Sequence, residues 1–281
     1  LATDLTLVAA SGQMICNGDA DRAPVRISIP QAWSHSACQA LVGALVANDE
    51  RSRSGHGQHV DVSTQQAMAE TALPAILHGP AGLPPQERMA GGVHQGPVHL
   101  RWTYPCSDGE VLITVAFGAM IGPMFRRFMD WMCEEGGCDE ATRDKDWVDF
   151  ALHIQNGDET LEELSRVMDL IAEFARTKTK AEFMKESLDR TLLVTPITDL
   201  ADVVESEQFA AREFWDDISG IRYPGPFIHA SESPLRRLGP APDLGQHDEE
   251  VRVSRISRPE LPPPAKKPQA SRPLEGLKVL D

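Results

Sequence analysis

The order of segments between residues 28 and 76 constrains the fold more than any other feature of the sequence. A short strand-like segment leads directly into an apolar helical stripe. The stripe recurs at four-residue spacing and consists of Ala37, Leu41 and Leu45 with Cys38, Val42 and Val46. We expect a helix over residues 34–46, with the hydroxyl of Ser34 or Ser36 capping its first backbone N–H groups.

The residues that follow this helix continue the same alternation of elements. Gly55 and Gly57 permit a tight reversal of the chain. A short strand over residues 59–62 and a second helix over residues 64–76 are expected next. Strand, helix, glycine turn, strand and helix in this order predict an α/β domain.

The rest of the chain contains several segments that differ in composition and in hydrophobic periodicity. A Gly/Pro-rich connection over residues 79–97 precedes a β-hairpin pattern that turns at Ser107-Asp108-Gly109, and three amphipathic helices follow. Thr179 with Glu182 predicts a capping box at the start of the third helix. The expected divisions are an α/β part over 1–97, a small α+β domain over 98–216, an extended return segment over 217–257, a Pro-rich basic linker over 258–272 and a strand-like segment over 273–281.

Composition excludes several classes of protein. A formal net charge of −15 disfavours binding to nucleic acid or to anionic membranes, and no apolar run approaches the ~18 residues of a membrane-spanning helix. Five scattered cysteines complete no metal-site pattern, so we expect no metal, reduced thiols and a cytoplasmic location. The first residues, LATDLTLVAASGQ, resemble neither a signal peptide nor a native start.

Four stretches together resemble the family III CoA-transferases, a group that includes formyl-CoA transferase, carnitine CoA-transferase and α-methylacyl-CoA racemase. The stretches are SGHGQHVDVSTQQAMAE, YPCSDGEVLITV, TPITDLADVVESEQFAAREFW and YPGPFIHASESPLRRLGPAPDLGQHDEEV. The resemblance implies an incomplete Rossmann-like large domain, of which residues 1–97 are the later part, plus a smaller α+β domain. PLEGLKVLD, after the linker, resembles the family's amino-terminal start, so we expect a gene fusion in which a second copy begins at residue 273.

The same resemblance implies a specific chemistry. In the family, one aspartate stands just before the helix that leads to G-x-G-Q. It attacks an acyl-CoA thioester, and the exchange proceeds through a mixed anhydride and an enzyme–CoA thioester. Counting back from Gln58 places Trp33 at that position, and a one-residue gap selects Ala32 or Ser34. We therefore expect no catalytic residue in this copy and expect the indole to bury roughly 150–250 Å² in place of nucleophile and acyl group.

Other residues offer no clear replacement. Asp21 and Glu50 are distant in sequence, whereas Ser34, His35 and Cys38 are the conceivable substitutes. His35 would fall in the first helical turn, where a capping or surface role is the alternative to a base.

The racemase branch of the family uses a histidine that precedes an aspartate in the segment resembling TDLTLVAASG, together with the same later aspartate. Thr3 stands at the histidine position, only Asp4 remains of that pair, and Trp33 stands at the later aspartate, so both acid–base partners are incomplete.

The resemblance also implies contacts and partners. Thr64, Gly91 and Gly92 stand where relatives approach CoA or carry a glycine-rich lid, although each also fits an ordinary helix start or turn. CoA and acyl-CoA are expected as substrates with a carboxylic acid, and no permanently bound cofactor is expected. A second copy, fused or in an interlocked dimer, would carry the reactive aspartate. The alternatives are a non-catalytic CoA-binding or assembly module and a racemase-like protein.

Overall fold

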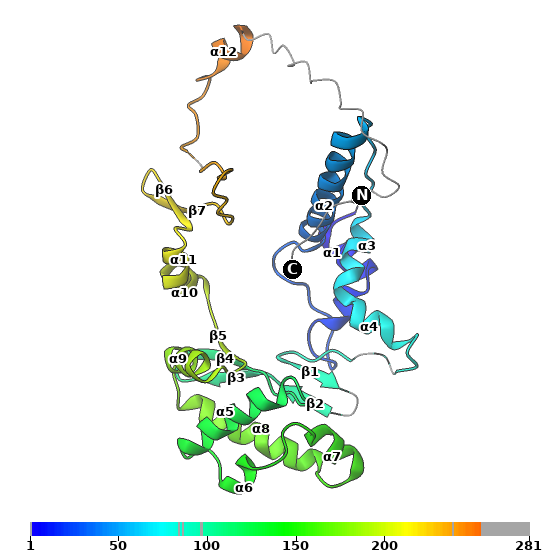
Figure 1. Ribbon diagram of the computed structural model, residues 1–281, viewed down its shortest axis with the longest axis vertical. Coiled ribbons are helices and arrows are strands. Elements are labelled where there is room, and N and C mark those ends of the chain that lie inside the picture. Colours follow the sequence, from blue (N-terminus) through cyan, green and yellow to red (C-terminus); the bar gives the residue numbers. More distant parts are fainter. Residues whose placement is uncertain (1, 84, 86, 96–97, 238, 254–281) are drawn as a thin grey trace. The chain divides into compact units, whose positions relative to one another are not determined.

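The computed structural model describes residues 2–83, 85, 87–95, 98–237 and 239–253 (Figure 1). The chain forms two compact units that divide between Pro196 and Ile197, and each is described by itself. The predicted linker over 258–272 and the strand-like segment over 273–281 lie outside the described residues. The domain boundaries expected at residues 97 and 216 stay predictions.

Helices make up the first part of the first unit. They are α1 (Asp4–Ala10), the 3-10 helix η1 (Gln13–Cys16), α2 (Ala32–Ser54), α3 (Thr64–Ala69), the 3-10 helix η2 (Glu70–Ala72) and α4 (Leu73–His78). The helix expected over 34–46 therefore extends at both ends, and it stops at Gly55, whose φ of 81° suits a glycine. The helix expected over 64–76 is divided into three short pieces, with a proline at the start of α4.

Two local expectations, one for α2 and one for the segment after it, are wrong. Ser34 and Ser36 do not cap the helix, because their hydroxyls donate to the carbonyl oxygens of Pro30 and Trp33 at 3.2 Å each. Residues 59–62 form no strand, since they have no hydrogen-bonded neighbour strand among the described residues. Val60 packs instead over Gly43 of α2.

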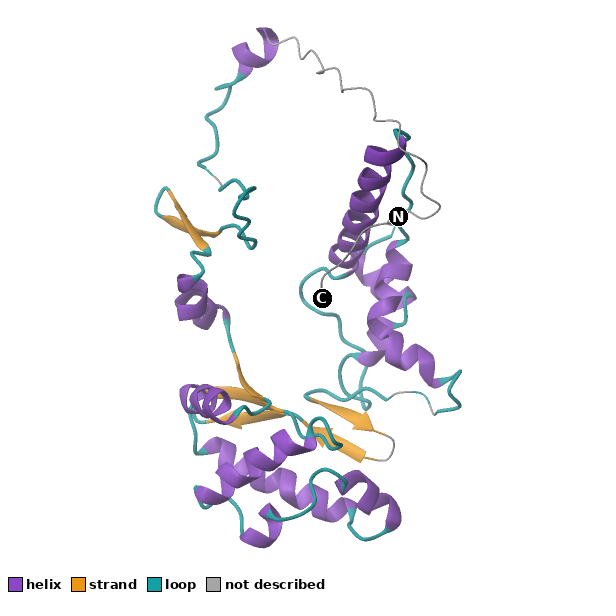
Figure 2. Cartoon of the chain, in the orientation of Figure 1, coloured by secondary structure: helices purple, strands orange, loops and turns teal. Residues whose placement is uncertain are grey.

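A mixed part with its own core follows in the same unit (Figure 2). Its strands are β1 (Gly92–Gln95), β2 (Val98–Arg101), β3 (Thr103–Cys106), β4 (Gly109–Ile113) and β5 (Val194–Ile197), and its helices are α5 (Gly122–Glu134), α6 (Glu140–Arg143), α7 (Phe150–Asn156), α8 (Leu161–Arg176) and α9 (Lys180–Arg190). β1 and β2 pair antiparallel, and a second sheet has the order β3-β4-β5. The predicted hairpin is confirmed, with Cys106 opposite Gly109 across the turn.

The predicted helical stripes supply most of this core. Aromatic and aliphatic side chains of α5 and α8 are almost fully buried, including Phe125, Phe128, Met132, Leu164 and Ile171. The capping box of α9 is confirmed: the backbone N of Thr179 donates to Glu182 Oε2 at 2.8 Å, and that of Glu182 donates to Thr179 Oγ1 at 3.2 Å. Met184 and Leu188 of the same stripe are exposed.

The second unit contains shorter elements. They are α10 (Leu200–Glu205), α11 (Glu207–Ala211), the antiparallel strands β6 (Trp215–Ile218) and β7 (Ile221–Pro224), and α12 (Asp248–Val253). The rings of Phe209, Phe214 and Trp215 contact one another. Arg237, in the extended stretch after β7, pairs with the buried carboxylate of Asp216.

Candidate functional site

The N-terminal end of α2 is the position at which the sequence places the reactive side chain of relatives. Trp33 is the second residue of the helix, and 48% of its side chain is exposed. About half of the indole is thus covered among the described residues, and its burial in place of nucleophile and acyl group stays a prediction. Ala32, the residue before it, is buried at the same end of the helix.

A carboxylate does lie at this end of α2, and it comes from Asp4. Asp4 is the first residue of α1, and its Oδ1 accepts a hydrogen bond from the backbone N of Ala32 at 2.8 Å. Its side chain is only 9% exposed, beside a small apolar cluster that includes Val8 and Met68. The second oxygen, Oδ2, is buried and has no hydrogen-bond partner among the described residues.

This enclosure decides what Asp4 can do. A carboxylate that attacks a thioester must present an oxygen to the substrate, whereas Oδ2 of Asp4 is covered by protein. The arrangement is that of a helix cap, with an anion at the positive end of α2. Sequence reasoning missed this role. The available signal was the absence of Ser, Thr, Asp or Asn at the N-cap, where Gln31 makes no capping bond.

The other candidate residues do not assemble into a reactive group. Within the described ranges, no side-chain hydrogen bond joins Ser34, His35 or Cys38 to another of the three. Asp21 pairs with Arg22 at 3.1 Å, and that hydrogen bond holds the pKa of Asp21 below its ordinary value. Glu50 belongs to the last turns of α2, far along the helix from Trp33.

The predicted CoA contacts have clear local roles. Thr64 opens α3 and is half-buried, and the preceding Ser63 is the N-cap that accepts from the backbone N of Gln66 at 3.3 Å. Gly91 has φ of 66° and accepts from the backbone N of Trp102 at 2.8 Å.

Gly92 begins β1, and a Cβ there would overlap the carbonyl oxygen of Leu100. These local roles explain both glycines without a ligand, and CoA binding at Gly91, Gly92 or Thr64 stays a prediction.

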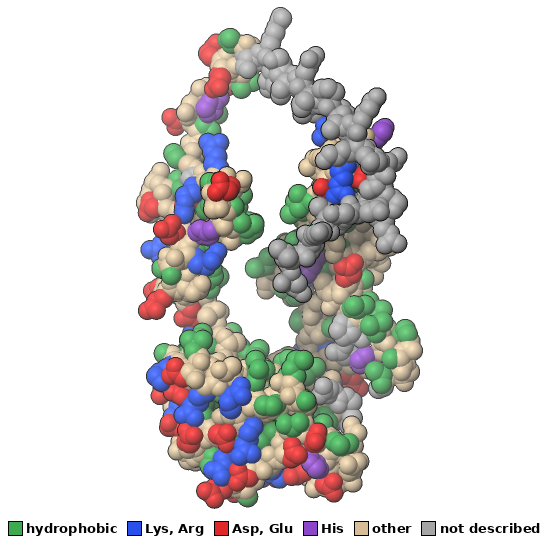
Figure 3. Space-filling view, in the orientation of Figure 1, with side chains coloured by type: hydrophobic (Ala, Val, Ile, Leu, Met, Phe, Trp, Pro, Cys, Tyr) green, Lys and Arg blue, Asp and Glu red, His purple; other side chains and the backbone are tan. Residues whose placement is uncertain are grey.

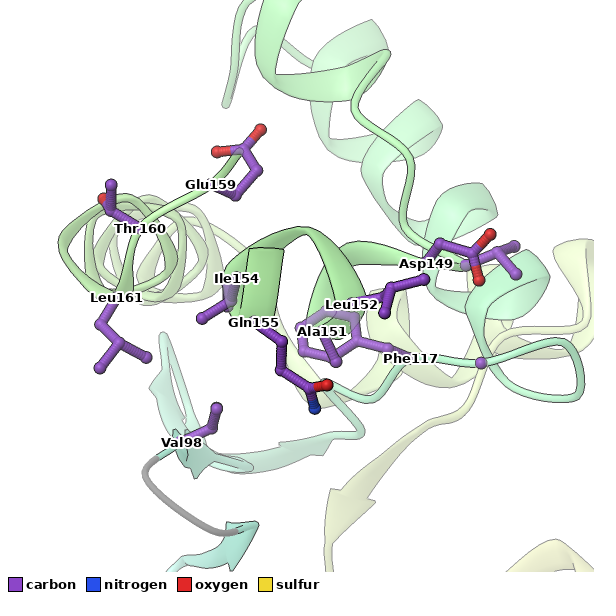
Figure 4. A pocket seen from close by; sticks show the side chains of 12 residues that line it. Val98, Phe117, Asp149, Ala151, Leu152, Ile154, Gln155, Glu159, Thr160 and Leu161 are labelled. Atoms are coloured by element: carbon purple, nitrogen blue, oxygen red, sulfur yellow. The ribbon is translucent and has the colours of Figure 1, made fainter. Parts of the chain in front are cut away.

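A separate cavity of about 760 Å³ lies in the mixed part (Figure 4). Its lining is mostly apolar, with residues of β2, α7 and the start of α8 such as Val98, Leu152 and Leu161. Asp149 and Glu159 are its charged lining residues, and Glu159 pairs with Lys145 at 2.6 Å. Among the described residues that line it there is no Lys or Arg, so these residues offer no cationic partner for a phosphate.

Among the residues that the structure describes, no group of three or more His, Cys, Asp and Glu side chains is placed to hold a metal ion. None of the described helices has the length and apolar character needed to cross a membrane.

Comparison with known proteins places these features in a family. The model of CoA-transferase family III matches residues 1–248. The subunit BbsE of succinyl-CoA:(R)-benzylsuccinate CoA-transferase from Thauera aromatica is 31% identical over 259 residues, which are 89% of this chain and 60% of that protein. The probable CoA-transferase Rv1866 from Mycobacterium tuberculosis is 27% identical over 290 residues, covering 100% of this chain and 34% of that protein.

A solved structure agrees with this assignment at the level of the fold. The CAIB/BAIF family protein from Brucella suis superposes with a TM-score of 0.66 at 20% identity, covering 89% of this chain and 62% of that one. The chain spans about three fifths of the length of the first curated relatives it matches. Since the family model covers most of the sequence, this mixed α/β chain belongs to CoA-transferase family III.

Proposed function

We propose that the full-length protein transfers CoA between an acyl-CoA and a carboxylic acid, and that the copy described here supports the exchange without being acylated. Family membership and the names of the relatives support the reaction class. The observation that carries the second half is the end of α2, where Trp33 stands at the family's aspartate position and Asp4 is enclosed.

The reaction requires an accessible carboxylate. Its oxygen attacks the thioester carbon, the CoA thiolate leaves, and a mixed anhydride forms. The thiolate then attacks the aspartyl carbonyl carbon of the anhydride, so that the donor carboxylate leaves and an enzyme–CoA thioester forms. The carboxylate of the acceptor acid attacks this thioester and releases the CoA thiolate, giving a second anhydride. The thiolate finally attacks the acceptor's carbonyl carbon, which gives the new acyl-CoA and frees the enzyme carboxylate. CoA is a substrate throughout, and no bound cofactor takes part.

A second copy would supply that carboxylate. We propose that it is fused to this one, because the Rv1866 relative matches the whole of this chain, beyond the family-model match at residue 248, and is much longer. A separate subunit is the other arrangement, and the relative named as subunit BbsE supports it. In either case Thr64, Gly91 and Gly92 are the proposed CoA contacts of this copy, in a cytoplasmic protein with reduced cysteines.

The racemase alternative has less support. Thr3, at the position of the racemase histidine, is the N-cap of α1, and its Oγ1 accepts from the backbone N of Thr6 at 3.3 Å. A threonine in a capping box is no base for an α-proton.

Trapping of the acyl intermediate tests the proposal. Full-length protein is incubated with acyl-CoA and hydroxylamine, and the modified peptide is identified by mass spectrometry. We expect one hydroxamate, on an aspartate of the second copy, and unchanged trapping in the Trp33→Phe variant. A hydroxamate on Asp4 would contradict the supporting role of this copy. No hydroxamate at all would contradict the transferase, and calorimetric binding of CoA without turnover would then favour a non-catalytic module.

A further inference from the structure

One carboxylate lies at the N-terminal ends of two helices. Asp4 begins α1, and its Oδ1 accepts from the backbone N of Ala32, the first residue of the 23-residue α2. Helix N-termini carry partial positive charge, so both ends favour an anion at this point. The anion comes from 28 residues away in sequence, and it is part of the chain.

The polar side chains at the start of α2 bond to backbone carbonyls and do not accept from the first N–H group of the helix. The side chain of Gln31 donates to the carbonyl oxygen of Ile29 at 3.1 Å, and the hydroxyls of Ser34 and Ser36 donate to backbone carbonyls. In the part of the chain that the structure describes, Asp4 is therefore the one side chain that accepts from the first N–H of α2. Asp4 is only 9% exposed and its Oδ2 is buried without a hydrogen-bond partner among the described residues, so the carboxyl group is enclosed at the helix end that carries Trp33.

We propose that Asp4 is a positioning residue that fixes the start of α2 through space and repels anions from the helix end beside Trp33. The second effect rests on the proposed function, because carboxylic acid substrates are the anions concerned. The family resemblance implies a reacting carboxylate at the positive end of this helix in active copies. In this copy the positive end is already neutralised by Asp4, so acid substrates are directed to the other copy.

Quenching of Trp33 fluorescence measures the charge directly. The emission of Trp33 is obtained as the difference between the full chain and its Trp33→Phe variant, because Trp102, Trp131, Trp147 and Trp215 also emit. Iodide is an anionic quencher and acrylamide a neutral one. We expect Asp4→Asn to raise the iodide quenching constant of Trp33 about twofold at low salt, with acrylamide quenching unchanged.

Asp21→Asn is the matched control, since it removes an exposed carboxylate that pairs with Arg22 in the loop before α2. An equal iodide response in both variants, or none in Asp4→Asn, would overturn the anion-repelling role.

Hydrogen exchange at the Ala32 amide measures the positioning role. We expect Asp4→Ala to speed exchange at Ala32 about tenfold, because the bond to a charged acceptor is lost, and Asp4→Asn to retain most of the protection. Near-UV circular dichroism of the buried Trp131 and Trp147 reports whether the mixed part stays folded. Equal loss of protection in the Asn and Ala variants, or no loss in either, would overturn the proposal. Neither measurement uses acyl-CoA, so a failure of the transferase reaction is distinguishable from a failure of this inference.

Discussion

Cysteine residues of this chain differ in environment, and the difference sets their reactivity. Burial, followed by the neighbouring Cys133, raises the pKa of Cys138 to about 12. Its thiol donates to the carbonyl oxygen of Met129 at 3.8 Å. Cys38, in contrast, is an exposed side chain on α2. Thiolate is the form that alkylating reagents attack, so the two residues should behave very differently.

The pH dependence of alkylation tests this contrast. With its pKa raised to about 12, Cys138 is about one part in ten thousand thiolate at pH 8, and its alkylation should rise steadily up to pH 10. We expect iodoacetamide at pH 8 to label Cys38 first and leave Cys138 unlabelled, as read by peptide mass spectrometry. The Cys38→Ser variant should lose the early label. Early labelling of Cys138 in that variant would contradict the prediction.

At the scale of elements, α2 is held to the segment after the glycine turn by a close approach at Gly43. A Cβ on Gly43 would lie 2.7 Å from Cγ1 of Val60, closer than real Cβ contacts allow. Val60 is β-branched and has little rotamer freedom to move away. The glycine in the middle of α2 is thus explained by packing, although glycine lowers helix propensity.

A Cβ added at Gly43 should destabilise α2, and a smaller side chain at position 60 should restore the lost stability. We expect Gly43→Ala to lower the free energy of unfolding of the α2 region by about 1 kcal/mol, measured by hydrogen exchange of α2 amides. Val60→Ala in the same chain should recover stability, because it removes the clashing methyl groups. Gly57→Ala is the control, since a Cβ there meets nothing within 4 Å. A loss of stability in Gly57→Ala as large as in Gly43→Ala would refute the packing explanation.

Features that depend on residues close together in sequence could be predicted, whereas features that depend on distant residues could not. The hairpin turn at Gly109 and the capping box of Thr179 each depend on residues a few positions apart, and both predictions are confirmed. The strand expected over 59–62 is wrong because a strand depends on a neighbour that no local pattern supplies. The capping role of Asp4 is not visible in the local pattern for the same reason, since its hydrogen bond to Ala32 joins residues 28 apart. Trp33 is expected just before the helix but is its second residue, and its exposure depends on what packs against that helix.

At the scale of the whole molecule, α2 presents apolar side chains to solvent. Leu41, Val42 and Leu45 are 60%, 58% and 61% exposed, and their spacing places them on one side of the long helix. Hydrophobic side chains are also visible on the surface of the space-filling view (Figure 3). Contiguous apolar surface of this kind is typical of an interface. The relatives are longer than this chain, so their additional residues are available to cover such a surface.

Dye binding to the 281-residue chain tests this reading. We expect it to bind anilinonaphthalene sulfonate and to self-associate in light scattering, and we expect Leu41→Gln with Leu45→Gln to reduce both signals. Leu188→Gln is the control, because Leu188 is 74% exposed on α9, away from α2 in sequence. The full-length protein should bind much less dye per copy. Equal dye binding by the full-length protein would argue against coverage of α2.

The ion pair between Arg237 and Asp216 limits how far the last described residues can travel. Asp216 is buried, so separation from the Arg237 guanidinium would leave its carboxylate without a cationic partner inside the second unit. Because this is unfavourable, we expect the ion pair to hold Arg237 in place. Only the residues after Arg237 can then move away from the second unit, and each adds at most about 3.5 Å of chain length. The segment from Arg237 to Val253 is therefore at most about 55 Å long when fully extended. Any surface that α12 meets in the complete protein must lie inside that radius.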